Sequence, residues 1–102
     1  MQGKRLPVVD GQLTIPEHPG EYCGPLMGYT GFLSAVFFLK PNARDVDAPK
    51  AARRLHHVCS PPHFFFEESD GTLTIKNSIG DLHEGVSDGW HGHLEKGVWR
   101  KV

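Results

Sequence analysis

Two short motifs in the second half of the chain carry residue types that bind metal ions. His57 and Cys59 are separated by one residue, and so are His91 and His93. Side chains alternate between the two faces of a β-strand, so each pair would direct both of its side chains to the same side. Three imidazoles and one thiolate suit Zn²⁺ in a tetrahedral site, with Fe or Ni as alternative metals. If the two strands lie near each other, we expect these four residues to bind zinc and stabilise a small core.

The same residues are compatible with other chemistry. His56 or His63 could replace one of the four ligands. Cys59 beside a histidine could form a thiolate–imidazole pair for nucleophilic catalysis, although no nucleophile signature surrounds it. The spacing from Gly85 to His91-Gly92-His93 matches only the start of a cupin motif, because the glutamate that follows comes too early. Without a metal, these histidines would be surface residues or hydrogen-bonded core residues.

The totals of the sequence limit the classes of function. The chain has 102 residues, enough for one domain, and its net charge is -1, from 11 basic and 12 acidic residues. Because the charges nearly cancel, the protein has no overall positive potential that would attract phosphates, which argues against nucleic acid as a partner. No apolar run is long enough to span a membrane, and the first residues lack the apolar segment expected of a signal peptide. We therefore expect a soluble, cytoplasmic protein whose two cysteines stay reduced.

Short strands joined by turns must position the candidate ligands. The 12 glycines and 8 prolines are typical of many turns and short elements. The expected fold is mostly β, a small antiparallel sheet or sandwich built of hairpins, with at most one short helix around residues 47–54. We expect a single domain over residues 1–102, in which residues 1–31 form a turn-rich N-terminal arm and residues 32–102 form the β core.

Alternating apolar residues and turn signals predict the individual strands. The apolar run 32–39 favours a buried strand over a helix, because it is short, rich in Phe and Val, and followed by Pro41. Asp10-Gly11 predicts a tight hairpin between residues 6–9 and 12–15, whereas prolines and glycines argue against any regular element from 16 to 31. The remaining strands are expected at 55–60, 63–68, 72–79, 89–95 and 98–102.

Three consecutive phenylalanines, Phe64 to Phe66, fall within one of these strands. Because side chains alternate, the three rings cannot all face the core. A ring that points outward needs another cover, such as a loop, a partner chain or a ligand. We expect the N-terminal arm to supply it.

The C-terminal part of the chain resembles a known group of proteins. The segments that carry the resemblance are Cys59-Ser60-Pro61-Pro62-His63-Phe64, Asp70-Gly71-Thr72-Leu73-Thr74-Ile75 with Asn77-Ser78-Ile79, and Gly89-Trp90-His91-Gly92-His93-Leu94, followed by Trp99. Over roughly the last 45 residues they are similar to small bacterial and phage proteins of unknown function, some of which are labelled ammonia monooxygenase. An upstream Cys-x-Cys-Gly motif of that group is absent here. The resemblance implies no established activity, and a chain of this size is too small for a monooxygenase.

Taken together, the sequence predicts a small metal-binding domain, with zinc as the cofactor, that acts by binding rather than by catalysis. One alternative is a small metal-dependent enzyme with an open coordination position. The other is a metal-free interaction module, such as a phage or bacterial accessory protein that forms a homodimer through its aromatic strand. The partner would be a protein or a small molecule.

Overall fold

The computed structural model describes residues 1–27, 34–41, 55–80 and 90–102. Within these residues the chain forms ten strands and no helix, which confirms the expected mostly-β fold. The short helix expected around residues 47–54 lies outside the described residues. The part of the chain that is described also contains no helix long and apolar enough to cross a membrane.

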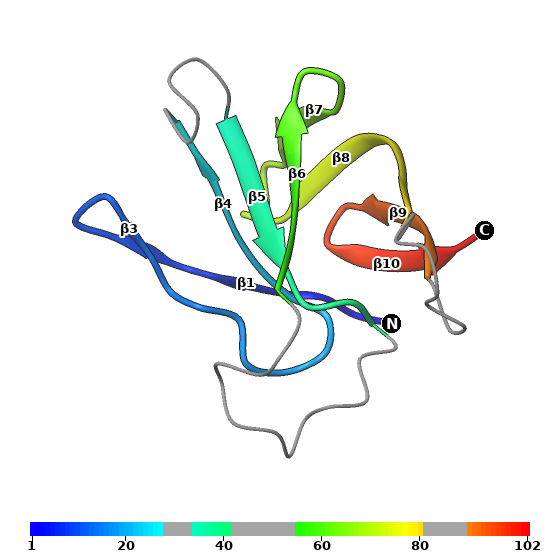
Figure 1. Ribbon diagram of the computed structural model, residues 1–102, viewed down its shortest axis with the longest axis horizontal. Coiled ribbons are helices and arrows are strands. Elements are labelled where there is room, and N and C mark those ends of the chain that lie inside the picture. Colours follow the sequence, from blue (N-terminus) through cyan, green and yellow to red (C-terminus); the bar gives the residue numbers. More distant parts are fainter. Residues whose placement is uncertain (28–33, 42–54, 81–89) are drawn as a thin grey trace.

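Two four-stranded sheets make up the body of the molecule (Figure 1). The first sheet has the order β1-β4-β5-β6 and the second the order β10-β9-β8-β7. All neighbouring strands in them are antiparallel except β1 and β4, which are parallel. The strands of the first sheet are β1 (Lys4–Leu6), β4 (Glu21–Leu26), β5 (Ser34–Phe38) and β6 (His56–Ser60). Those of the second are β7 (Phe64–Glu67), β8 (Leu73–Gly80), β9 (His91–Glu95) and β10 (Val98–Lys101).

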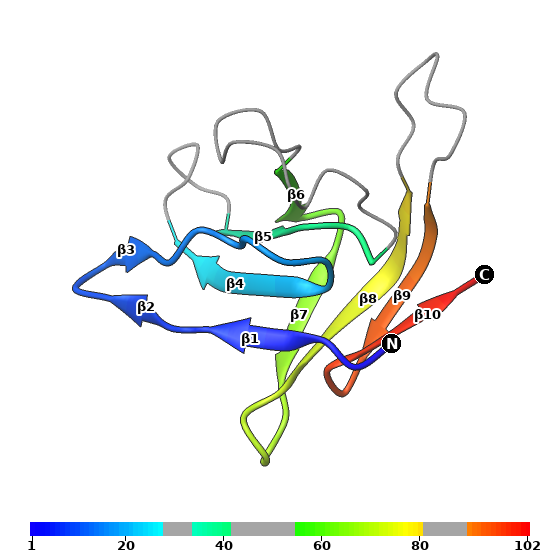
Figure 2. The ribbon, with the colours of Figure 1, turned by 90° about the horizontal axis from the view of Figure 1, so that it is seen from below.

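The predicted hairpins are confirmed at their expected turns. A small hairpin of β2 (Val8–Val9) and β3 (Gln12–Leu13) extends beyond the end of β1 (Figure 2). Its turn residues Asp10 and Gly11 have φ values of 52° and 75°, as a two-residue turn of this kind requires. The β7–β8 and β9–β10 hairpins also form, the latter around Lys96-Gly97.

The expectation of no regular element from residue 16 to residue 31 is wrong for residues 21–26, which form β4. This strand lies between β1 and β5 in the first sheet, so β1 and β4 are strands of the β core, while the β2–β3 hairpin forms a separate two-stranded sheet. The register between β4 and β5 shifts between Cys23 and Leu26, where Gly24-Pro25 interrupts the strand. Such a bulge tolerates a proline, which cannot donate a backbone hydrogen bond. Gly24 has a φ of 126°, a conformation that favours glycine.

Aromatic and aliphatic side chains from both sheets form one core. Trp99 lies at its centre, with its ring edge-on to those of Tyr22 and Trp90, at centroid distances of 6.2 and 5.5 Å. The indole N–H of Trp99 donates a buried hydrogen bond of 2.8 Å to the carbonyl oxygen of Gly20. The other core residues are Val36, Phe38, Leu73, Ile75, Ile79 and Leu94, with Val58 and Phe65 packed against them.

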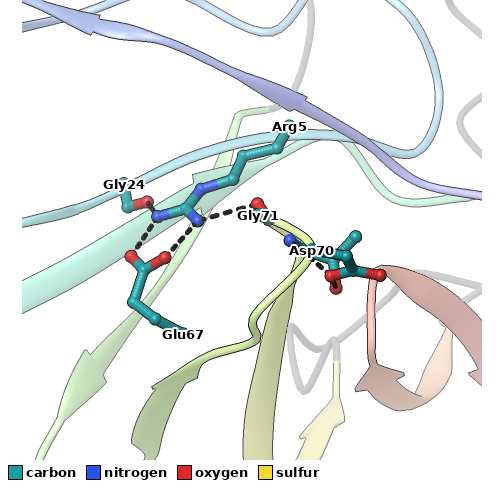
Figure 3. Close-up of polar contacts among 6 residues, drawn as sticks. Arg5, Gly24, Glu67, Asp70 and Gly71 are labelled. Atoms are coloured by element: carbon teal, nitrogen blue, oxygen red, sulfur yellow. Dashed lines mark hydrogen bonds and ion pairs between the residues drawn. The ribbon is translucent and has the colours of Figure 1, made fainter.

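Contacts between distant parts of the chain join the two sheets. Gln2 bridges to Val98, and the Gly3 N–H donates to the Gly97 carbonyl oxygen at 2.8 Å. The first residues of the chain therefore pair with β10, while the residues that follow them pair with β4. At another point, the Arg5 guanidinium on β1 donates to both carboxylate oxygens of Glu67 on β7 (Figure 3). The two sheets are thus fastened to each other from the N-terminal strand.

Candidate functional site

His57 and Cys59 lie on β6, an edge strand of the first sheet. Val58 between them packs against the core, so both candidate ligands point away from it. The His57 ring lies beside the ring of Phe37 on the neighbouring strand, with centroids 5.6 Å apart. The sequence therefore predicted correctly that this pair shares a face.

His91 and His93 lie on β9, inside the second sheet. Gly92 and Leu94 are buried, and the two histidines alternate with them on the outer face. A Cβ on Gly92 would lie 2.1 Å from the Arg100 carbonyl oxygen and 2.5 Å from the Trp90 ring, so glycine is required here for Trp90 to pack. The spacing again gives the correct face for both histidines.

The structure does not bring the four predicted zinc ligands together. One pair points outward from the first sheet and the other from the second. Among the described residues, no group of three or more His, Cys, Asp or Glu side chains could hold a metal ion. The physical reason is that period-two spacing fixes the face of a strand but not the sheet to which the strand belongs.

The reserve ligands and the second cysteine lie elsewhere. His56 faces the interior, where its ring stacks with that of Phe38 at a centroid distance of 5.8 Å. His63 Nε2 lies 3.1 Å from the Ser78 carbonyl oxygen and so connects the start of β7 with β8. Cys23 is buried on β4, its thiol 3.4 Å from the Pro7 carbonyl oxygen, and both cysteines are free.

The described residues expose a different candidate site, on the outer face of the second sheet. Phe64 and Phe66 remain 54% and 48% exposed there, whereas Phe65 between them packs against the core. The expected cover by the N-terminal residues is therefore wrong, because those residues are occupied in the sheets. An open groove of ≈ 660 Å³ runs beside the Phe66 ring. Its lining residues are Phe66, Glu67, Glu68, Thr74, Ile75, Lys76, Asn77, His93, Glu95 and Lys96.

We call this surface the aromatic face, and its side chains form two rows across the strands. In the basic row, Phe64 pairs with Lys76, and His93 pairs with Arg100. Lys76 and His93 both line the groove, so the row runs from β7 to β10.

The second, acidic row lies one side-chain repeat away along the strands. Phe66 pairs with Thr74, and Glu95 pairs with Val98. The Thr74 hydroxyl donates to the Glu68 carboxylate at 2.7 Å, which places a second negative charge in this row. The backbone N–H of Lys96 donates to the same hydroxyl oxygen at 2.9 Å and thereby ties the β9–β10 turn to β8. The aromatic face therefore presents cations on one side and carboxylates on the other, with two exposed rings at the β7 end.

Arg5 and its hydrogen-bond partners Glu67, Gly24 and Gly71 fix the end of β7 next to this face (Figure 3). Besides Glu67, the guanidinium donates to the carbonyl oxygens of Gly24, at 2.8 Å, and Gly71, at 3.0 Å. The hydrogen bonds from Arg5 hold the pKa of the Glu67 carboxyl below its usual value. Glu67 is therefore ionised and held by Arg5, which keeps its charge out of the acidic row.

Chemically, this arrangement suits association with another surface. The exposed rings offer apolar area and the two rows offer charges of both signs, while hydroxyl and amide groups supply hydrogen bonds. The alternation of the Phe64-Phe65-Phe66 run was the sequence signal for this face.

Comparison of the chain with protein-family models, with curated proteins and with solved structures finds no match. The resemblance of the C-terminal part to small bacterial and phage proteins therefore stays an expectation from the sequence.

Proposed function

We propose that this chain is a protein-binding domain and that the aromatic face is its binding surface. The observation that carries the proposal is the exposure of Phe64 and Phe66 side by side on an edge strand, next to the groove. Burying a fully exposed phenyl ring stabilises by roughly 1.5–3 kcal/mol, so covering the exposed half of each of these rings is worth roughly half of that. A partner surface that covers both rings would recover this energy.

The charges of the face favour a polypeptide as the partner. Lys76 and Arg100 could pair with carboxylates of a partner, and Glu68 and Glu95 with its basic side chains. The same two carboxylates would repel phosphates, and the net charge of -1 adds no attraction for them. Binding rather than catalysis agrees with the leading expectation from the sequence, but without the metal site, whose four ligands lie on two different sheets.

A selection from a phage-displayed random peptide library tests this proposal. The library is selected against the immobilised protein alone, and every enriched peptide is then titrated against the unmodified protein and a Phe64→Ser/Phe66→Ser variant. We expect the enriched peptides to bind the variant at least tenfold more weakly, a loss of about 1.4 kcal/mol. Their ¹H–¹⁵N chemical-shift changes should fall on β7, β8 and β9.

A matched control is the variant Val8→Ser/Val9→Ser, which removes two side chains that are 40% and 55% exposed on the β2–β3 hairpin. It should bind the selected peptides as the unmodified protein does. The proposal is refuted if the selected peptides bind both double variants equally, or if their shift changes map to the first sheet. Thermal melting of each variant verifies that it is folded.

A further inference from the structure

The layout of charge on the aromatic face is complementary to itself. The basic row contains Lys76, Arg100 and the imidazole of His93, and the acidic row contains Glu68 and Glu95. The rows are parallel and lie roughly 7 Å apart, the distance of two residues along a strand. Lys96 lies in the β9–β10 turn, past the β9 end of the acidic row. The two rows are defined by the charges on the strands themselves.

A two-fold axis can bring two such faces into register. If the axis lies in the plane of contact, between the rows and parallel to them, a rotation of 180° lays the basic row of one copy over the acidic row of the other. Each copy contributes the same patch, which is the defining property of an isologous contact. The phenylalanines follow the same rule, since Phe64 and Phe66 occupy the β7 ends of the two rows. Phe64 of each copy then meets Phe66 of the other, and His93 of each meets Glu95 of the other.

From this geometry we infer that the partner of the aromatic face is a second copy of this chain, and that the two copies form an isologous dimer with each basic row against the other's acidic row. This inference rests on the proposed function, because it names the partner of the same face. Two features favour a second copy over an unrelated chain. The face carries its own complementary charges, and the net charge of -1 leaves little repulsion between two copies as they approach.

The size of the face sets the strength of the dimer. Four strands spaced ~4.8 Å apart and two rows roughly 7 Å apart give a face of roughly 270 Å² per copy, or about 540 Å² in total. This is below the roughly 1,200 Å² that stable interfaces bury, so the dimer should be weak and concentration-dependent, with a dissociation constant above about 1 μM. Because part of the contact is electrostatic, raising the ionic strength from about 0.05 to about 0.5 M should weaken it several-fold.

Charge reversal gives a decisive test by sedimentation-velocity centrifugation, at concentrations from about 10 μM to about 1 mM. The first variant, Lys76→Glu/Arg100→Glu, makes both rows acidic, and the second, Glu68→Lys/Glu95→Lys, makes both rows basic. Each variant alone should associate at least tenfold more weakly than the unmodified protein. An equal mixture of the two should associate again, because each row then meets a row of opposite charge.

Two controls make the outcome specific. Lys4→Glu reverses an exposed charge on β1 and should leave the dimer unchanged. Phe64→Ser/Phe66→Ser introduced into the second variant should abolish its association with the first. Self-association that persists in both charge-reversed variants overturns the inference, and so does a mixture that stays monomeric. Association that is lost in EDTA and restored by Zn²⁺ would also overturn it, in favour of a metal bridge between histidines.

The two proposals can fail separately. If the protein is monomeric at about 1 mM yet the selected peptides still bind the aromatic face, the dimer is excluded and the protein-binding function stands. If no peptide binds the face and no dimer forms, both proposals fail.

Discussion

Replacing Arg5 by methionine should destabilise the fold more than an ordinary surface substitution does. The Arg5 side chain is 24% exposed and its guanidinium joins three parts of the structure: Glu67 on β7, Gly24 on β4 and Gly71 in the β7–β8 turn. Methionine keeps a similar apolar stem but removes every donor. The variant therefore tests the hydrogen bonds and the ion pair rather than the packing.

The size of the effect follows from the exposure of each partner. Glu67 is 59% exposed, so its pairing with Arg5 should contribute no more than about 0.2–1 kcal/mol. The two carbonyl oxygens lose a charged donor, at about 0.5–1 kcal/mol each, the smaller value applying to the exposed Gly71. The total is about 2 kcal/mol, which lowers the Tm of a domain near 100 residues by roughly 8–16 °C.

The effect should also depend on pH. Arg5 lowers the pKa of Glu67 in the folded state. A carboxyl with a lowered pKa stabilises the fold above its unfolded-state pKa, near 4.3, and this contribution is lost as the pH falls through the folded-state pKa. At pH 7 the ion pair therefore makes its full contribution to the difference in stability between the unmodified protein and Arg5→Met. This contribution should shrink below about pH 4.3.

Urea unfolding followed by tryptophan fluorescence measures these differences, since Trp90 and Trp99 are both buried. Arg5→Lys is the matched control, because it keeps the charge but not the planar fork, and it should recover less than half of the loss. Equal stability of the unmodified protein and Arg5→Met at pH 7 would refute the reasoning. A difference that is as large at pH 3 as at pH 7 would refute the role of Glu67.

Three further predictions concern the core, a close backbone contact and the histidines. Leu94→Ala, at a side chain with no exposed surface, should cost roughly 2–5 kcal/mol in urea unfolding. Gly92→Ala should cost about 2 kcal/mol or more, because the new Cβ would overlap the Arg100 carbonyl oxygen, whereas Gly71→Ala meets no atom within 4 Å and should cost only about 1 kcal/mol for its φ of 85°. His91→Ala should shift the free energy of unfolding by no more than about 0.5 kcal/mol, since its side chain is exposed on the sheet. A larger loss that appears only when zinc is present would contradict this last prediction and restore a metal site.

Local signals in the sequence were sufficient for most of the strands. Asp10-Gly11 and Lys96-Gly97 mark their hairpins, because few residue pairs tolerate positive φ at both positions of a tight turn. The alternation of Leu73, Ile75 and Leu94 with polar residues gives the buried face of the second sheet correctly. These features depend only on neighbours in the chain.

The parts that could not be predicted depend on contacts far apart in the sequence. β4 contains Gly24-Pro25 and begins with a buried Glu21, whose carboxylate accepts the backbone N–H groups of Glu17 and His18 at 2.8 and 2.9 Å. In the sequence alone, the Gly-Pro pair and the buried glutamate both argue against a central strand. The bulge and the hydrogen bonds that accommodate them are seen only in the structure. The separation of the four candidate zinc ligands was not predictable for the same reason, since no local pattern reports that β6 and β9 belong to different sheets.

The pairing of the first residues with β10 has a consequence for how the chain folds. The Trp99 N–H donates to the Met1 carbonyl oxygen at 2.8 Å, a contact between residues that are 98 positions apart in the chain. During synthesis at roughly 5–20 residues per second, the N-terminal strand leaves the ribosome several seconds before its β10 partner exists. Since loop closure of this length is entropically expensive, joining the two ends should be a late folding step. Until then, β1 and β4 must hold the N-terminal part of the fold without their link to the second sheet.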